Sequence, residues 1–370
     1  MSEKDDILAD GIITRQIQLL RFTAGTRGKV LEILRRMEEE LTEKLFYSGR
    51  KLTEIGREDL ARLLRQTTDL IEQYYSEAAS YMGGELTALG RVEAVAVAAS
   101  LDGAFRGAVT PSLPTEAYFR RLAGNTLIQG APSAAWWKQQ SETTAFRFAN
   151  EVRQGLAQAE TNAQIVQRIM GRATGYSVVD GKRVYRYAGG AMDVERRNAA
   201  ALVQTSVQAV ANTARRDTFL ANDDIIKGVR HVSTLDSHTS HVCVGYSQAA
   251  WSIPGYKPIA PNTKLYNGGT PRHWNCRSVE IPITKTFREL GIDLDEFDPS
   301  TTTRSANGGP VAADLSFGAY LKRKPDSFVD DLLGPGRAQL WRDGKMTLPQ
   351  LLDQSGRPLT LKELRKKYGG

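Results

Sequence analysis

Apolar residues recur three and four positions apart through much of the first hundred residues, which predicts long amphipathic helices. The clearest series has charged residues between its apolar positions and consists of Val30, Leu34, Met37, Leu41 and Leu45. A second series runs from Leu60 to Tyr75, and we expect Gly83–Gly84 to interrupt it before a small-residue helix from Val92 to Ala99. Residues 1–110 are therefore predicted to form a helical arm or bundle.

The next segment is also predicted to be helical. Pro111 and Pro114 mark a linker. Helical patterns follow it at Tyr118–Leu122, Trp136–Val152 and Ile165–Ile169. The Trp136–Trp137 pair has two interpretations, a stacking platform for nucleic-acid bases or a part of the core with one edge exposed.

A change to strand-like spacing follows. Ser177–Tyr187 alternates β-forming residues around Asp180–Gly181, which predicts a hairpin with a two-residue turn. Glu195–Phe219 returns to helical spacing and carries a buried apolar stripe and a second, polar stripe. The polar stripe consists of Thr205, Gln208, Asn212 and Arg215. It is expected either to face solvent or to lie against the residues that follow Gly228–Leu235, a predicted strand.

The chain changes character after Ile283. Asp298–Pro310 reads as a polar linker without periodic apolar positions. Short helices, several ended by glycine, are predicted beyond it at Ser316–Arg323, Asp326–Leu333 and Gly336–Arg342. Thr360 and Glu363 fit a capping box for a last, basic helix. We expect these helices to dock on another subunit or on the main domain.

These patterns predict an α+β, predominantly α-helical protein in three parts. Residues 1–110 form the helical arm, residues 111–285 a central module with a small β-sheet, and residues 286–370 the linker and docking tail.

The residues at the N-terminus are acidic and polar, unlike a signal peptide. The apolar run at Ala94–Ala99 is far shorter than the roughly 20 residues of a membrane span. We therefore expect no membrane partner.

The net charge of +7 and pI of about 9.3 favour a polyanionic partner only weakly, because a solvated basic surface has the same composition. Two cysteines in 370 residues do not make a secreted disulfide framework, which is typical of a protein made in a reducing cytoplasm.

One stretch, His231–Ser278, contains all the histidines and cysteines of the chain. They are His231, His238, His241, Cys243, His273 and Cys276. His273 and Cys276 are three residues apart, and His241 or His238 with Cys243 supplies the other half of a Cys/His metal site of the kind zinc prefers. Arg272 and Arg277 beside these residues suit contacts with phosphate or a partner.

Other interpretations of the stretch remain open. Cys243 and Cys276 can instead form a disulfide, or be two buried small hydrophobes. A Cys–His nucleophile pair and a metal-dependent nuclease are further alternatives. The common nucleotide-binding and hydrolase motifs, among them the P-loop, GxSxG and HExxH, do not occur in the chain, which argues against an enzyme.

The same stretch resembles the phage Mu F-like minor head (head morphogenesis) protein family. The family's strand, "TLD" and first Cys motif correspond to Thr234–Asp236, Thr239 and Ser240-x-x-Cys243. Its Gly–Pro turn and second motif correspond to Gly268–Gly269, Pro271 and His273-x-x-Cys276–Arg277–Ser278. The helix with Thr205 and Asn212 and tail segments at Tyr320–Pro325, Leu333–Gly334 and Leu359–Leu364 also resemble the family. The resemblance covers roughly residues 115–370.

The chain departs from the family pattern at two positions. Ser240 and Ser278 stand where many relatives have cysteine, so a four-cysteine site is impossible here. A metal must then use Cys243, His273 and Cys276 with His241, or with His238 or Asp236 in its place.

The resemblance implies a non-catalytic minor capsid protein of a tailed bacteriophage, with Asp236, Cys243, His273, Cys276 and Arg277 holding two loops of the module together. It would be made in the host cytoplasm and incorporated, in several copies, inside the virion head at the portal vertex. Its expected partners are the portal protein, the major capsid and scaffold proteins and double-stranded DNA. The alternative is a metal-dependent DNA-acting enzyme that uses the His/Cys cluster.

Overall fold

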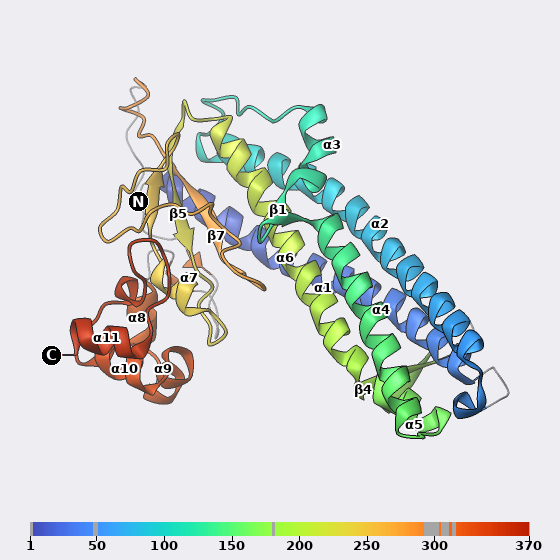
Figure 1. Ribbon diagram of the computed structural model, residues 1–370. Coiled ribbons are helices and arrows are strands. Elements are labelled where there is room, and N and C mark those ends of the chain that lie inside the picture. The colour runs from blue at the N-terminus through green and yellow to red at the C-terminus, as the bar shows by residue number, and fades with distance from the viewer. Residues whose placement is uncertain are drawn as a thin grey trace. The chain divides into compact units, whose positions relative to one another are not determined.

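The structure is a computed structural model that describes residues 3–46, 51–179, 182–291, 303–304, 311–312 and 316–369. Within these residues the chain forms eleven α-helices, and its strands form sheets of two or three antiparallel strands (Figure 1). The predicted α+β, predominantly helical fold is confirmed. Among the described residues, no helix combines the length and apolar content that spanning a bilayer requires.

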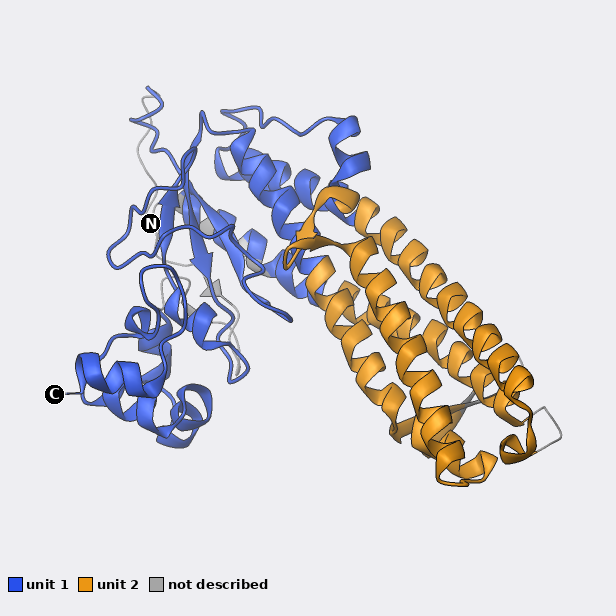
Figure 2. Cartoon of the chain, viewed as in Figure 1, with its two compact units in different colours: residues 1–20, 89–122, 207–370 blue, residues 21–88, 123–206 orange. Residues whose placement is uncertain are grey.

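The chain divides into two compact units (Figure 2). Unit 1 contains residues 1–20, 89–122 and 207–370, and unit 2 contains residues 21–88 and 123–206. Helices α1 (Glu3–Phe46), α2 (Arg57–Ala104) and α6 (Ala191–Leu220) each contribute residues to both units. The units are therefore discontinuous in sequence, whereas the predicted parts are consecutive.

Unit 2 is a bundle of long helices. The C-terminal part of α1, most of α2 and the first half of α6 pack with α4 (Ser133–Ala157) and α5 (Asn162–Met170). The short elements η1 (Leu52–Glu54), β1 (Leu127–Ile128) and β2 (Ala131–Pro132) connect the helices. Trp137 is 2% exposed and lies 6.3 Å from Tyr75 between ring centroids, so it belongs to the core.

The predicted break at Gly83–Gly84 is wrong, because α2 continues through both glycines. A glycine inside a helix costs only about 1 kcal/mol relative to alanine. The buried residues on both sides of the pair, Ala78, Met82, Leu86 and Leu89, offset that cost by packing.

The predicted hairpin is present in unit 2. Strands β3 (Gly171–Val179) and β4 (Lys182–Gly189) are antiparallel, with Val179 opposite Lys182. The turn at Asp180–Gly181 lies outside the described residues.

Unit 1 is built on a three-stranded antiparallel sheet in which β5 (Ile226–Val232) is central. It lies between β6 (Ala250–Ser252) and β7 (Val279–Thr284), and Val229 is opposite both Trp251 and Pro282. The hydrophobic core joins this sheet to the start of α1 and the ends of α2 and α6. Its buried members include Leu8, Ile12, Leu101, Phe105, Phe219, Val229, Trp251 and Ile281.

Helix α3 (Glu116–Asn125) follows the predicted linker at Pro111 and Pro114. The short helix α7 (His241–Gly245) follows β5. Strands β8 (Thr303–Arg304) and β9 (Val311–Ala312) pair with each other, and the rest of the predicted Asp298–Pro310 linker lies outside the described residues.

The C-terminal segment of unit 1 forms a small helical layer. Its elements are α8 (Phe317–Leu321), α9 (Asp326–Leu333), α10 (Pro335–Arg342), η2 (Leu348–Leu351) and α11 (Leu361–Tyr368). Their apolar residues share one buried cluster with Leu235 and Val244, from the loop after β5 and from α7. The tail therefore docks on the main domain of its own chain.

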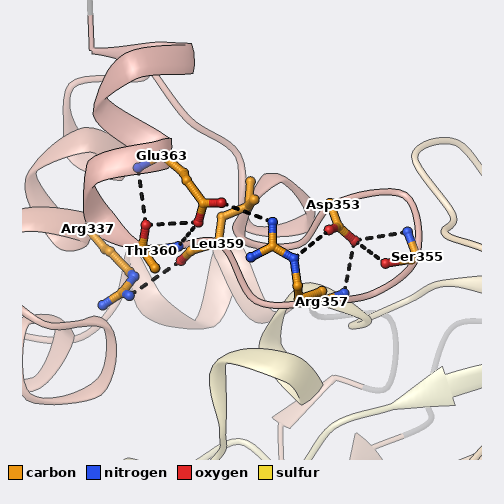
Figure 3. Close-up of polar contacts among 7 residues, drawn as sticks. All are labelled: Arg337, Asp353, Ser355, Arg357, Leu359, Thr360 and Glu363. Atoms are coloured by element: carbon orange, nitrogen blue, oxygen red, sulfur yellow. Dashed lines mark hydrogen bonds and ion pairs between the residues drawn. The ribbon is translucent and has the colours of Figure 1, made fainter.

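The predicted capping box starts α11. Glu363 N–H donates to the Thr360 hydroxyl at 3.3 Å, and Thr360 N–H donates back to the Glu363 carboxylate at 2.7 Å (Figure 3). Arg357 connects this cap to the preceding turn, because its guanidinium donates to Glu363 and to Asp353, each at 3.0 Å.

The polar stripe of α6 is buried, contrary to its interpretation as a solvent-facing surface. Thr205, Gln208, Asn212 and Arg215 are each at most 4% exposed. Arg215 pairs with the buried Glu93 of α2 at 2.7 Å, and its Nη1 lies 3.4 Å from the Gln16 side-chain oxygen. Arg215 therefore joins α6 to α2 and α1 inside unit 1.

Candidate metal centre

The two motifs of the His/Cys stretch meet at the end of β5. The chain leaves this central strand, turns at Asp236 and enters α7, in which Ser240 is the N-cap and Cys243 lies in the first turn. The second motif lies directly before β7, which pairs with β5. Pairing of β5 with β7 therefore brings residues about 30 positions apart into one site.

Cys243, His273 and Cys276 form the centre of this site. Sγ of Cys243 lies 3.2 Å from Nε2 of His273 and 3.6 Å from Sγ of Cys276. The three donor atoms all lie within 4.8 Å of one another, and the group can hold a metal ion. Cys243 is 2% exposed and Cys276 is fully buried, whereas His273 is half-buried. Among the described residues no other such group of three occurs.

Both cysteines are free in this structure, and their sulfur atoms are well beyond the bonded distance of about 2.05 Å. The alternative of a Cys243–Cys276 disulfide is therefore not the state that the structure contains. The alternative of two inert buried hydrophobes does not account for an imidazole within hydrogen-bonding distance of the Cys243 sulfur.

Hydrogen bonds orient the three donor groups. The Trp274 carbonyl accepts from Nδ1 of His273 at 2.8 Å, which directs Nε2 toward the sulfur atoms. The Ser240 hydroxyl lies 2.7 Å from the same Nε2 and also accepts the N–H of Cys243. The Ser278 hydroxyl hydrogen-bonds Cys243. Thus Ser240 and Ser278 both contact the donor groups.

The thiols are electrostatically distinct. A hydrogen bond from Cys243, with further support from His273, holds the pKa of Cys276 well below its ordinary value. The same hydrogen bond, together with burial, raises the pKa of Cys243. Burial lowers the pKa of the His273 imidazole, but its interaction with Cys276 outweighs that effect and raises it. These surroundings therefore favour the thiolate form of Cys276, the form that binds a metal ion.

An ion pair between Asp236 and Arg277 connects the two motifs beside the donor residues. The Arg277 guanidinium makes a two-pronged ion pair with Asp236, in which Nη2 donates to Oδ1 at 2.8 Å. Oδ1 also accepts the N–H of His238 at 2.9 Å and the Thr239 hydroxyl at 3.2 Å. Burial alone would raise the pKa of Asp236, but Arg277 and these hydrogen bonds lower it. Asp236 is thus committed to Arg277 and lies outside the three-donor group.

The other predicted metal ligands also lie outside the group. Nε2 of His241 is 2.9 Å from the Leu332 carbonyl of α9, and burial lowers the pKa of this imidazole. His238 is exposed. His231 lies inside β5, where its Nδ1 accepts from Arg272 at 3.4 Å.

Arg272 lacks the exposure that its predicted contact with phosphate or a partner requires. Its side chain is 1% exposed, lies 3.7 Å over the Tyr246 ring and faces the buried Glu280 at 3.7 Å. Burial raises the pKa of Glu280, while Arg272 and Arg216 counteract the rise. Arg272 is therefore a core residue in this structure and does not present a phosphate contact.

Sequence reasoning missed one residue that supports the site. The amide of Gln16, in α1, donates to the Arg277 carbonyl at 3.4 Å. Nothing in a helix pattern distinguishes this glutamine from a surface residue. Ser240, by contrast, has a recognisable signal, because serine three residues before Cys243 fits a helix N-cap.

Comparison of the chain with protein families, with curated proteins and with solved structures found no match in any of the three.

Proposed function

We propose that the Cys243–His273–Cys276 group binds zinc. Zinc in a tetrahedral site has Zn–S bonds of about 2.3 Å and Zn–N bonds of about 2.0–2.1 Å, which places two sulfur ligands about 3.8 Å apart and a sulfur and a nitrogen about 3.6 Å apart. The corresponding separations are 3.6 Å and 3.2 Å, so small side-chain shifts suffice. With three protein donors, a water molecule or a serine hydroxyl completes the tetrahedron.

Burial favours a structural role for this zinc. Both sulfur donors are shielded from solvent, and the donors join α7, which follows β5, to the loop before β7. A nuclease needs its metal to reach a phosphate of the substrate, so this burial argues against the alternative of a metal-dependent nuclease. Plasmid nicking with added magnesium, manganese or zinc, compared between the natural protein and His273→Ala, tests that alternative directly.

We propose further that the chain is a minor head protein of a tailed bacteriophage that joins the procapsid at the portal vertex and is not an enzyme. One observation carries this proposal. The two motifs through which the chain resembles the Mu F-like family contact each other twice, through the Asp236–Arg277 ion pair and through the donor atoms of Cys243, His273 and Cys276. In this proposal the cluster stabilises a module that binds the portal protein, and the zinc has no chemical step to perform.

The test is co-elution of the purified protein with the portal protein encoded by the same genome, in size-exclusion chromatography at low and at high salt. A complex at both salt concentrations is expected. Cys276→Ser should lower the thermal stability and the portal association together, because the cluster supports the fold of the binding module. The proposal would be overturned if no complex formed at both the low and the high salt concentration. It would also be overturned if Cys276→Ser lost only its thermal stability or only its portal association.

A further inference from the structure

The hairpin of β3 and β4 in unit 2 is an exposed ribbon. The two strands pair only with each other among the described strands. In their register Tyr176 is opposite Tyr185 and Val178 is opposite Arg183, so these four side chains share one face. Tyr176 is 49% exposed, Tyr185 38% and Val178 64%. Neighbouring large apolar residues this exposed commonly mark a surface that binds a partner.

An arginine continues the aromatic row on this face. The Arg183 guanidinium lies over the Tyr176 ring at 4.9 Å. The ring centroids of Tyr176 and Tyr185 are 6.0 Å apart, and those of Tyr185 and Tyr187 are 6.3 Å apart. Cross-strand tyrosines stabilise an isolated hairpin, but that role requires neither the arginine nor the exposed valine.

The charged residues of the two strands are all basic, and Asp180, between the strands in sequence, is the acidic residue of the hairpin. Arg172, Arg183 and Arg186 are exposed, and neither strand contains an aspartate or a glutamate. Arg186 belongs to the opposite face, where its guanidinium covers Gly175, so a side-chain carbon placed at Gly175 would lie 3.1 Å from it. Both faces therefore carry positive charge.

We propose that this hairpin binds double-stranded DNA. A two-stranded β-ribbon fits the major groove of B-DNA, and arginines along it meet the phosphates on each side of the groove. The exposed tyrosines and Val178 then contact sugars and base edges inside the groove. The surface contacts DNA mainly through charge, so the binding is largely independent of sequence. The proposal rests on the proposed head function only in identifying the DNA as the packaged genome.

The experiment measures fluorescence anisotropy of a labelled duplex of about two helical turns, titrated with the full-length protein between about 50 and 200 mM salt. The variant R183Q/R186Q removes two charges from the hairpin. Its matched control, R65Q/R153Q, removes two exposed arginines from α2 and α4 of the same unit. Circular dichroism verifies that each variant is folded.

The slope of log affinity against log salt is negative, and we expect R183Q/R186Q to reduce its magnitude by about 2. R65Q/R153Q should leave the slope unchanged. Y176A/Y185A should weaken binding while the salt slope stays the same. Equal effects of R183Q/R186Q and R65Q/R153Q, or no binding by the natural protein, would overturn the proposal. Binding to single strands alone would overturn the duplex assignment. Portal co-elution of R183Q/R186Q separates the two proposals, because loss of DNA binding with the portal complex intact leaves the head function standing.

Discussion

Replacing Glu93 by alanine should destabilise unit 1 by about 3–5 kcal/mol, because the substitution leaves a buried guanidinium without its carboxylate. The Glu93 side chain is 0% exposed and that of Arg215 is 1% exposed. Nε of Arg215 donates to one Glu93 oxygen at 2.8 Å, and Nη2 of Arg215 lies 2.7 Å from the same oxygen. Nε of Arg15 donates to the other Glu93 oxygen at 2.8 Å. Arg15 is 25% exposed and can turn to water, whereas Arg215 cannot.

The assay is urea unfolding followed by circular dichroism, with the free energy taken from the transition of unit 1. Glu116→Ala is the matched control, because Glu116 pairs with Arg91 at 2.8 Å while both side chains are more than half exposed. Loss of such a surface pair costs at most about 1 kcal/mol. The double variant Glu93→Leu with Arg215→Met should recover most of the lost stability, since it leaves no unpaired buried charge. A cost for Glu93→Ala no larger than that for Glu116→Ala would refute the reasoning.

Three further predictions concern the metal centre. Cys276→Ser should weaken zinc binding by more than the roughly 10–100-fold that loss of an outer-shell partner costs, as measured by competition with a chromophoric chelator. His241→Gln should leave zinc affinity unchanged and destabilise the C-terminal helices by about 1 kcal/mol, because its ring contacts Leu332 and not the donors; a loss of zinc would contradict this. In the metal-free protein, the ion pair of Asp236 should contribute stability that is full above pH about 3.9 and is lost as the pH falls through the lowered pKa of the folded state. Asp236→Asn should remove that part of the acid dependence. Identical acid unfolding curves for the natural protein and Asp236→Asn would contradict this prediction.

The helices of this chain were predictable because their signals are local. The stripe from Val30 to Leu45 and the capping box at Thr360 and Glu363 depend only on neighbouring residues, and both appear as predicted. The discontinuous units were not predictable, because no local pattern tells which part of a 48-residue helix such as α2 packs against which neighbour. The same limit explains Gly83–Gly84, where packing overrides the low helix propensity of glycine.

The site was predictable in composition but not in ligand choice. Spacing in the sequence brought Cys243, His273 and Cys276 into the candidate set, and the structure places their donor atoms together. The sequence predicted His241 as the fourth ligand, with His238 and Asp236 as alternatives. Which of these residues can reach the metal depends on contacts with residues distant in the chain. The Leu332 carbonyl is hydrogen-bonded to His241, and Arg277 forms an ion pair with the carboxylate of Asp236. Arg272 was misassigned for a similar reason, since only the fold reveals the buried Glu280 that faces it.

The most direct test of the metal centre is elemental analysis of the natural protein purified under reducing conditions, combined with X-ray absorption at the zinc edge. The account predicts a single zinc ion per chain, with two sulfur ligands at about 2.3 Å and a nitrogen ligand at about 2.0–2.1 Å, and its loss in Cys276→Ser. A protein that contains no zinc and binds none when its reduced thiols are titrated with it, or a Cys276→Ser protein that keeps the metal, would contradict the account.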